Sequence, residues 1–441
     1  MKKQAKISRP NFRRTMPKLI SFLEENGAVE LMGYNKVGDN TLPNIVPLLM
    51  GYSNEELKSI CHPFTYSQYD LCPLIWNLFE RLGYYTAFFE DNWRAIFNYL
   101  DGGFLRQPTN YYIRTFIKQT SEMFEFENDP AFYNDFCMHD KYFFEVLLEY
   151  FERLTKLLQS KRLFGFIWES TLTHGNLNYP VFMDTPYVEL LSRWKKSKYL
   201  DETILIVLSD HGMRFGLDRF TIQGRLEDRL PFVFVLTPPS FRIKYNRAYN
   251  NLKLNSRRLT TAFDVHAMML DLVKLENIND ARIISRSKQS YGARREISLF
   301  LPIPPNRTCE MAEISDHWCT CHSYIKKSNT DKDIVIAAQK VTESLNGMLI
   351  KYPQCEYLIL AAILDANELS WEETSQLHYT NFMLVIRTTP GNAVFEATIR
   401  NKENRWTLVT FPSRLNLYGN QSHCIHNAQL KLYCYCKDYE E

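Results

Sequence analysis

The sequence predicts an α/β fold with a central, mostly parallel sheet, followed by a smaller α+β module. Short apolar runs such as "LFGFIW", "TILIVLS" and "LPFVFVL" alternate with helical stretches through the first 300 residues. Strands that are apolar on both faces are typical of a parallel sheet covered by helices. After residue 300 the chain becomes rich in Pro and Cys, and beyond it four apolar runs follow one another with a single helical stretch before them.

The first part of the chain reads as helices that alternate with strands. "FRRTMPKLISFLEENG" has helical spacing and stops at Gly27, and "AVELMGY" follows as a strand. "DLCPLIWNLFERLG" is predicted to start at a cap, Asp70, and to end at Gly83, before the strand "YYTAFF". An amphipathic stretch over 140–161 leads into "LFGFIW", and a helix over about 186–199 leads into "TILIVLS".

The second part has a different pattern. "LFLPIPPNRTCE" indicates an irregular connection, and a helix is predicted over about 331–351. The runs "EYLILAAIL", "NFMLVIRTT", "AVFEATIRN" and "RWTLVTF" follow, with the hairpin signal "TPGNA" between two of them. We therefore expect a first domain over 1–300, a Cys/Pro-rich connection over 301–329 and an α+β module over 330–441.

Composition excludes some classes of function. Lys+Arg 52 against Asp+Glu 50 gives a net charge of +2, which provides no general field for nucleic acid or anionic lipid. No apolar run approaches the roughly 20 residues that a membrane span needs. We predict no nucleic-acid partner and no transmembrane segment in this chain.

The cysteines favour an oxidising compartment. Six of the ten lie in two late clusters: Cys309, Cys319, Cys321, Cys424, Cys434 and Cys436. Structural zinc favours C-x-x-C arms, whereas both clusters contain C-x-C, which fits disulfides better. The glycosylation acceptors Asn306 and Asn420 lie beside the clusters. The sequence predicts an extracellular or lumenal glycoprotein whose targeting segment is missing from this chain; a cytosolic protein with reduced cysteines is the alternative.

Two strand ends carry candidate site residues. "TILIVLS" is followed directly by Asp210 and His211, a carboxylate and an imidazole at the edge where ligands of α/β sheets gather. They would be metal ligands, or Asp210 would cap a helix with His211 nearby. "LFGFIW" is followed by Glu169 and His174, which would face one pocket or lie separately on the surface.

Thr41, in "GDNTLPN" before an apolar run, has two interpretations. It would cap the helix that begins near Leu42, or it would act as a nucleophile at the start of that helix. Both roles place its hydroxyl at a helix N-terminus, where backbone N–H groups favour an anionic group.

Together these segments resemble the alkaline phosphatase and sulfatase superfamily. "GDNTLPN" is similar to the threonine segment of its nucleotide pyrophosphatase branch, and "SDHG" is similar to its metal-binding Asp-His-Gly. "GYYTAFFEDNW" and "LTTAFDVHAMMLDLV" resemble sulfatase segments. "QGRLEDRLPFVFVLTP", "LPIPPNRTCE", "HWCTCH" and the closing "YGNQSHC" and "YCYC" resemble an uncharacterised animal family of secreted or type II membrane ectodomains. The resemblance covers nearly the whole chain from Ile7.

The resemblance implies an alkaline-phosphatase-like sandwich and a site. Thr41 would be the nucleophile, and Asp210, His211 and Thr41 would hold a divalent metal, which would be zinc, manganese, magnesium or calcium. Asn44 would donate to a substrate oxygen and His174 would contact the substrate or leaving group. The substrate would be an anionic phosphate or sulfate ester. His266 matches no ligand position and is predicted to be a packed helix residue.

One departure bears on activity. The superfamily begins with a buried central strand that ends in a ligand Asp, and Ala5 stands at that position here. The first strand is therefore expected to be missing, and Asp39 or Asp91 would have to substitute for the lost ligand. We predict a sulfatase/phosphatase-like hydrolase of impaired activity; the alternative is a catalytically inactive extracellular binding glycoprotein, a pseudoenzyme. Arg214, Arg225 and Arg229 would bind an anion or, more simply, form structural ion pairs.

Overall fold

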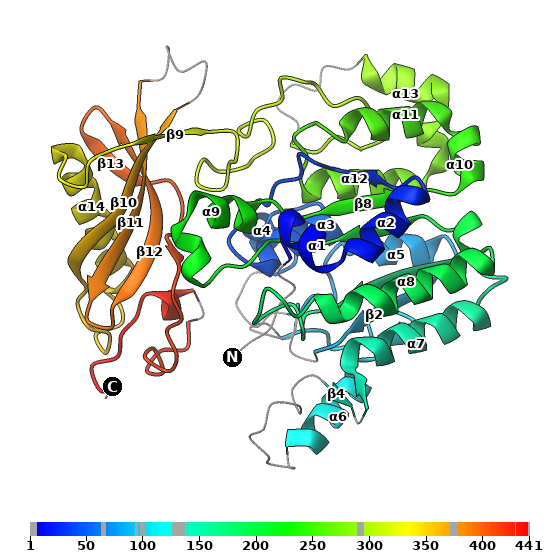
Figure 1. Cartoon of the computed structure of the whole chain (residues 1–441), viewed down its shortest axis with the longest axis horizontal. Helices are drawn as coiled ribbons and strands as arrows, with labels where there is room; N and C mark the ends of the chain where they lie inside the picture. The colour runs from blue at the N-terminus through cyan, green and yellow to red at the C-terminus, as the bar shows by residue number, and fades with distance from the viewer. Residues whose placement is uncertain are drawn as a thin grey trace. The chain divides into compact units, whose positions relative to one another are not determined.

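The computed structural model describes residues 7–62, 68–92, 96–97, 102–125, 137–138, 140–288, 295–370, 378–427 and 429–439. Position 5, where the superfamily's first Asp was expected, lies outside these ranges. The chain divides into two compact units (Figure 1). The larger unit contains Lys2–Met213 and Leu230–Glu313; the smaller unit contains Arg214–Arg229 and Ile314–Glu441.

A parallel three-stranded sheet forms part of the larger unit. Its order is β3 (Tyr111–Tyr112), β2 (Tyr85–Glu90) and β6 (Leu163–Trp168). Tyr85 to Glu90 pair in register with Leu163 to Trp168. The apolar runs that predicted these strands lie in them, so the α/β class with a parallel sheet is confirmed.

A second three-stranded sheet has the order β1 (Val29–Glu30), β8 (Val233–Leu236) and β7 (Leu205–Leu208). Its pairs are antiparallel. The continuous apolar pattern of β8 therefore reflects burial on both faces and not a parallel direction. Val233 and Val235 belong to one hydrophobic core of the unit, and Phe234 and Leu236 belong to the other.

The two sheets line the same two cores. Phe164, Phe166, Ile206 and Leu208 pack against one core, whereas Leu163, Ile167, Leu205 and Val207 pack against the other. Within the described ranges, β6 pairs only with β2 and β7 pairs only with β8. All four residues of β7 are partly exposed, whereas those of β8 are buried. In the described ranges, β6 and β7 are thus each left with one unpaired edge, although both strands are apolar on both faces.

Helices cover these sheets, and two of the helix predictions are wrong in detail. The single predicted N-terminal helix is divided, because Pro17 cannot continue the hydrogen bonding of the preceding turn. Asp70 does not cap the third predicted helix, which begins at Ile75 beyond Pro73. Asp70 instead accepts from the backbone N–H groups of Leu105 and Arg106, at 2.9 and 2.8 Å. The helices and the small hairpin of this unit are α1 (Arg9–Thr15), α2 (Pro17–Glu25), α3 (Thr41–Met50), α4 (Asn54–Ile60), α5 (Ile75–Arg81), α6 (Arg114–Glu125), β4 (Cys137–Met138), β5 (Lys141–Tyr142), α7 (Phe143–Leu157), α8 (Val181–Lys196), α10 (Pro239–Lys244), α11 (Asn246–Asn255), α12 (Ala262–Val273) and α13 (Asp280–Ser287).

Helix α3 is held against α12. It ends at Gly51, which has φ +75° and would place a Cβ only 2.7 Å from Cδ2 of His266. His266 Nδ1 lies 2.9 Å from the carbonyl oxygen of Leu48, to which it donates. Burial lowers the pKa of His266, and the hydrogen bond to Leu48 opposes this. The prediction of a packed helix histidine is confirmed.

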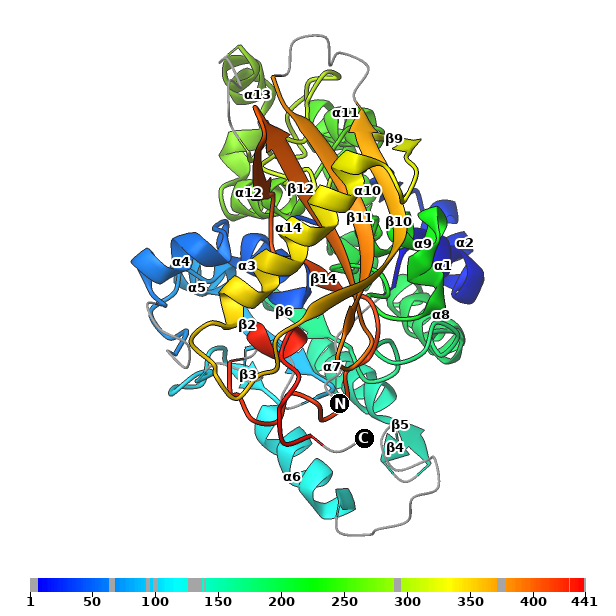
Figure 2. The ribbon, with the colours of Figure 1, turned by 90° about the vertical axis from the view of Figure 1, so that its left-hand side faces the viewer.

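The smaller unit is built on an antiparallel sheet, as predicted. Its order is β13 (Arg405–Leu408), β12 (Ala393–Lys402), β11 (Thr380–Thr389), β10 (Ile359–Ser370) and β9 (Ser323–Lys326), with β14 (Ser413–Arg414) also paired to β12. The "TPGNA" hairpin joins β11 and β12, with Gly391 at φ +77°. Figure 2 shows α14 (Lys332–Leu349) lying across one face of the sheet, and α9 (Ile222–Arg229) belongs to the same unit. The core between α14 and the sheet contains Ile334, Val341, Phe382 and Phe395.

Disulfides account for most of the cysteines. Cys61–Cys72, Cys355–Cys434 and Cys424–Cys436 are bonded, and Cys309 and Cys319 are also in disulfide bonds. Each cluster of three potential metal ligands that contains a cysteine therefore includes sulfur already used in a disulfide. These bonds fit a secreted or lumenal domain.

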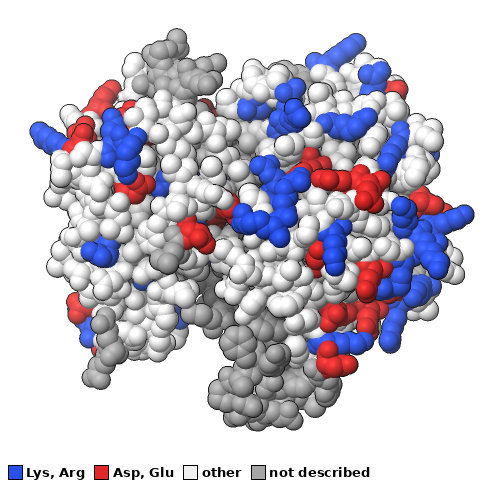
Figure 3. All heavy atoms as spheres, in the orientation of Figure 1, with Lys and Arg blue, Asp and Glu red and all other residues white. Residues whose placement is uncertain are grey.

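The surface agrees with the balanced composition. On the face that Figure 3 shows, acidic and basic side chains lie next to one another. Among the helices of the described ranges, none is long and apolar enough to cross a membrane.

Candidate functional site

The candidate site lies where the start of α3 meets the carboxyl end of β7. Thr41 is the first residue of α3, and Asp210 and His211 follow β7 after a single intervening residue, Ser209. All three side chains are buried, with exposed fractions of 1, 2 and 0%. The structure thus brings Thr41 together with the adjacent pair Asp210 and His211, and His211 lies 170 positions further along the chain.

The ring of His211 has a defined orientation. Its Nδ1 lies 2.7 Å from the carbonyl oxygen of Gly212, and only a protonated nitrogen can donate there. In the neutral ring the lone pair is therefore on Nε2. Nε2 lies 3.3 Å from Oδ2 of Asp210 and 3.4 Å from Oγ1 of Thr41. One carboxylate oxygen and one hydroxyl oxygen therefore lie within 3.4 Å of the same imidazole nitrogen.

Thr41 does not cap its helix. The N-cap position is Asn40, in extended conformation, and no side chain there makes a capping hydrogen bond. The capping interpretation of Thr41 is therefore wrong. Its hydroxyl is directed to His211 instead.

Asn44 holds the loop that precedes Thr41. Its Oδ1 accepts from the backbone N–H groups of Val37 and Gly38, at 2.7 and 3.2 Å. Its Nδ2 donates to the carbonyl oxygens of Gly38 and Asn40, at 3.1 and 2.8 Å. Two donor and two acceptor positions are all that the amide offers. This geometry favours a positioning role over the predicted donation to a substrate oxygen.

Removing this amide tests the positioning role. We expect Asn44→Ala to lower the free energy of unfolding by about 1–3 kcal/mol, because it leaves buried backbone groups of Val37 and Gly38 without partners. Asn44→Asp should also be destabilising, because it keeps the acceptor but turns its second carboxylate oxygen toward the carbonyl oxygens of Gly38 and Asn40. Urea denaturation of the two variants measures both losses. Equal stability of Asn44→Ala and the unmodified chain would contradict the assignment.

A second group of acids lies at the carboxyl ends of β2 and β6. Asp91 accepts from the N–H and Oγ of Ser170 at 2.9 and 3.1 Å, and from the N–H of Thr171 at 2.8 Å. It therefore anchors the loop that follows β6. In the described part of the chain, no third His, Cys, Asp or Glu joins Asp210 and His211 in a group of ligand atoms within 4.8 Å of one another. Neither Asp91 nor Asp39 completes the ligand set as a substitute.

Glu169 is buried directly after β6. Its Oε2 accepts from the hydroxyl of Tyr187, and its Oε1 is buried with no hydrogen-bond partner in the described ranges. Burial raises its pKa well above the ordinary value, Tyr187 opposes the shift, and the charge of Asp91 adds to it. For Glu90 burial raises the pKa to about 8, with opposition from the N–H of Ile96 and an added contribution from Asp91. For Glu90 this favours the neutral form at neutral pH.

His174 lies on the turn after Glu169, where its backbone N–H donates to the carbonyl oxygen of Ser170 at 3.1 Å. Glu169 is held by Tyr187 rather than by an ion pair with this histidine. The contact of His174 with a substrate stays a prediction.

Tyr34 was missed by sequence reasoning. It is 2% exposed, and its pKa is raised first by burial and then by the negative charges of Asp210 and Asp264. It lies seven residues before Thr41, and the only signal in the sequence was an aromatic residue in the glycine-rich "MGYNKVG" segment.

Two of the three arginines considered as anion ligands are structural. Arg225 and Arg229 form ion pairs with Glu396 in the smaller unit, at 2.7 and 2.6 Å. The ion-pair interpretation is confirmed for both.

The chain matches several solved structures at low sequence identity. The periplasmic domain of phosphoethanolamine transferase EptC from Campylobacter jejuni has 11% identity and a TM-score of 0.39, over 61% of this chain and 86% of that chain. A protein of the alkaline phosphatase superfamily from Vibrio parahaemolyticus has 11% identity and a TM-score of 0.41, over 98% and 86%. The sulfatase PsFucS1 from Pseudoalteromonas sp. has 11% identity and a TM-score of 0.40, over 88% and 78%.

No curated protein matches the chain. A family model does match, over residues 6–364, which is most of the sequence. The matched segment includes Thr41, Asp210 and His211. The chain belongs to the family described as "Protein of unknown function (DUF229)".

Proposed function

We propose that the chain is a metal-dependent hydrolase of phosphate or sulfate esters, with Thr41 as the nucleophile and Asp210 and His211 as metal ligands. The supporting observation is that Asp210 Oδ2 and Thr41 Oγ1 lie 3.3 and 3.4 Å from the same atom, His211 Nε2. The resemblance of "GDNTLPN" and "SDHG" to superfamily motifs points to the same residues.

The donor set suits a divalent cation. Carboxylate oxygen and neutral imidazole nitrogen are ligands that zinc and manganese accept. The hydrogen bond from Nδ1 of His211 to a backbone carbonyl is the outer contact that orients a metal-binding histidine. When bound, a divalent ion would lower the pKa of the Thr41 hydroxyl and offset negative charge on the ester.

The protein itself supplies the nucleophile and an anion site. The first-turn N–H groups of α3 have no partners within the helix, and the positive end of its dipole favours an anionic ester beside Thr41. Thr41 Oγ1 attacks phosphorus or sulfur and loses its proton to water, while the bond to the alcohol oxygen breaks and the alcohol leaves with a proton taken from water. Water then hydrolyses the ester formed on Thr41. Asn44 keeps the loop before Thr41 in place during both steps.

We infer that the activity is lower than that of a site in which three strong protein ligands hold the metal. Two protein ligands with a hydroxyl make a weak set, since catalytic zinc is ordinarily held by three stronger protein ligands. A second candidate function follows from the same observation: an extracellular binding glycoprotein that retains the fold without turnover. In the described ranges, no third His, Cys, Asp or Glu forms a group of ligand atoms within 4.8 Å of one another with Asp210 and His211, which favours this candidate.

Metal content separates the two candidates. We expect elemental analysis of the purified chain to find about one divalent metal per chain, with a loss of at least about tenfold in affinity for Asp210→Ala. Asp201→Ala, which removes an exposed carboxylate from the same unit, is the matched control and should retain the metal.

Either of two results would count against the hydrolase. Equal metal content in Asp210→Ala and in the unmodified chain would mean that the ion binds elsewhere. A folded, monodisperse chain without metal would support the second candidate.

A further inference from the structure

A basic patch lies at the ends of two neighbouring helices of the larger unit, α7 and α8. In Figure 3, Lys and Arg side chains gather at the right-hand edge of the view, where these helix ends lie in Figure 1. The segments 152–162 and 193–202 contain three acidic residues, Glu152, Asp201 and Glu202. They contain eight basic residues: Arg153, Lys156, Lys161, Arg162, Arg193, Lys195, Lys196 and Lys198. The net charge of +2 for the whole chain therefore does not show this local concentration of positive charge.

Contacts between α7 and α8 bring the two segments together. The carboxylate of Glu152 on α7 lies 3.0 Å from Nζ of Lys156 and 2.9 Å from Nη2 of Arg193 on α8. The ring of Phe151 packs against that of Trp194, with 5.9 Å between their centroids. The dipole of each helix favours cations at this end. The basic patch is thus one surface built from two segments of the chain.

Five of the eight cations have no ionic partner in the described ranges. Lys156 and Arg193 share Glu152, and Arg162 donates to the carbonyl oxygen of Leu82 at 2.8 Å. The other five side chains are exposed and form no side-chain hydrogen bond or ion pair within the described part of the chain: Arg153, Lys161, Lys195, Lys196 and Lys198. Several like charges on one surface repel one another and attract a ligand with several negative charges.

We propose that the basic patch binds a sulfated polysaccharide. Such a polymer presents sulfate groups in a row, so it can neutralise several of these cations at once. Residues 194–199, "WKKSKY", contain two adjacent lysines and a third after one intervening residue, a short basic run of the kind that binds heparin. The exposed side chains of Gln159 and Ser160 offer further donors to sulfate oxygens.

The surroundings of the patch favour a polysaccharide over a lipid bilayer. A helix that lies on a membrane combines basic residues with an exposed apolar face. The apolar side chains of Leu154, Leu190 and Leu191 are instead buried in the core of the larger unit. Leu157 is the only large apolar side chain of the two segments that is exposed.

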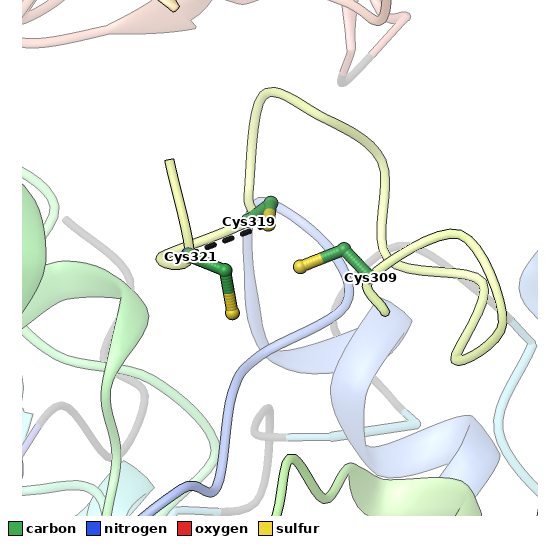
Figure 4. Close-up of side chains that lie close together, drawn as sticks. All are labelled: Cys309, Cys319 and Cys321. Atoms are coloured by element: carbon green, nitrogen blue, oxygen red, sulfur yellow. Dashed lines mark hydrogen bonds between the residues drawn. The ribbon is translucent and has the colours of Figure 1, made fainter. Parts of the chain in front are cut away.

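The disulfides agree with a ligand of this kind. Eight of the ten cysteines are disulfide-bonded, including Cys309 and Cys319, which Figure 4 shows beside the thiol of Cys321. These bonds fit a secreted or lumenal domain, and sulfated polysaccharides are made in the secretory pathway and displayed outside the cell.

The patch is separate from the candidate site. Its second segment precedes β7, whereas Asp210 follows β7, and a strand of four residues spans about 13 Å. Binding at the patch therefore does not depend on the proposed hydrolase activity.

Two charge-matched variants test the patch in the full chain. The patch variant combines Lys195→Gln, Lys196→Gln and Lys198→Gln. The control variant removes three exposed cations elsewhere in the same unit by combining Lys274→Gln, Arg282→Gln and Lys288→Gln. We expect the unmodified chain to bind immobilised heparin in 0.15 M NaCl and the patch variant to bind at least about tenfold more weakly, because each lost contact lowers the slope of log K against log salt by about one. The control variant should stay within about twofold of the unmodified chain.

A comparison of ligands tests the chemistry. Heparin is compared at the same salt with hyaluronan, which carries carboxylates but no sulfate, and with vesicles of phosphatidylcholine and phosphatidylserine. We expect heparin to bind at least about tenfold more tightly than hyaluronan and the vesicles. Three results would each overturn the proposal: no heparin binding by the unmodified chain, equal weakening in the patch and control variants, or vesicle binding as tight as that of heparin.

Discussion

Thr41→Ala is expected to lower the kcat of metal-dependent ester hydrolysis by roughly four orders of magnitude or more, which is the scale on which loss of a nucleophile acts. Thr41 is buried at the first turn of α3, and its Oγ1 lies 3.4 Å from Nε2 of His211. Assays with aryl phosphate, phosphodiester and sulfate esters, with added divalent metal, measure the loss.

Thr41→Ser is the matched control. It retains the hydroxyl and removes only a methyl group, so it should keep much of the activity. Because Thr41 makes no capping hydrogen bond, Thr41→Ala should change the free energy of unfolding by no more than about 1 kcal/mol. A Thr41→Ala chain with unchanged, metal-dependent turnover would exclude the nucleophile assignment. A chain without turnover before mutation would favour the binding glycoprotein.

The sequence predicted those parts of the fold that depend on local patterns. The apolar runs of β2, β6, β7 and β8 and the alternating runs of β10 to β12 are strands, because burial on one or both faces is written into consecutive residues. The direction of β8 was not predictable in this way. A strand buried on both faces has the same apolar pattern in either direction, and its antiparallel pairing with β7 is a matter of topology.

Long-range contacts account for other features of the fold that no local pattern specifies. "GRLEDR" contains alternating charges that are typical of an exposed helix, yet Arg225 and Arg229 are buried. Their partner Glu396 lies 171 and 167 positions further along the chain. No window of sequence contains both sides of such a contact. Residues 214–229 belong to the smaller unit, although the rest of that unit lies about 100 residues further along the chain, so local sequence could not predict this assignment either.

In the candidate site, too, local patterns were readable from the sequence and long-range contacts were not. Asp210 and His211 could be found from sequence because they directly follow a strand, and Thr41 because it begins a helix after "GDN". The resemblance implied that Asn44 donates to a substrate oxygen, and Asp91, like Asp39, was considered as a substitute ligand. In the structure, the hydrogen bonds of Asn44 and Asp91 hold loops. A polar side chain next to a site can position the backbone or contact the ligand, and only its hydrogen bonds decide which.

Glu396→Gln is expected to lower the free energy of unfolding of the smaller unit by about 3–5 kcal/mol, the cost of breaking a buried ion pair from one side. Glu396 is fully buried on β12 and accepts from Arg229 at 2.6 Å, Arg225 at 2.7 Å and Arg219 at 3.4 Å. Without its charge, these buried guanidinium groups would lose their shared counter-ion. Urea denaturation, with hydrogen exchange of the β11 and β12 amides to locate the effect, measures the loss.

Glu368→Gln is the control, because the pair of Glu368 with Lys327 is partly exposed and should contribute about 0–1 kcal/mol.

The pH dependence of stability provides an independent check on Glu396. Burial alone would raise the pKa of Glu396, but Arg229, Arg225 and Arg219 outweigh it and hold the pKa well below the ordinary value. Stability from this carboxylate is therefore present above about pH 4.3, the ordinary pKa of glutamate, and is lost as the pH falls toward the lower folded-state pKa. Glu396→Gln should remove that part of the acid dependence. Suppose that Glu396→Gln lowers the free energy of unfolding no more than Glu368→Gln does and leaves the acid dependence unchanged. The three arginines would then not depend on Glu396 for their burial.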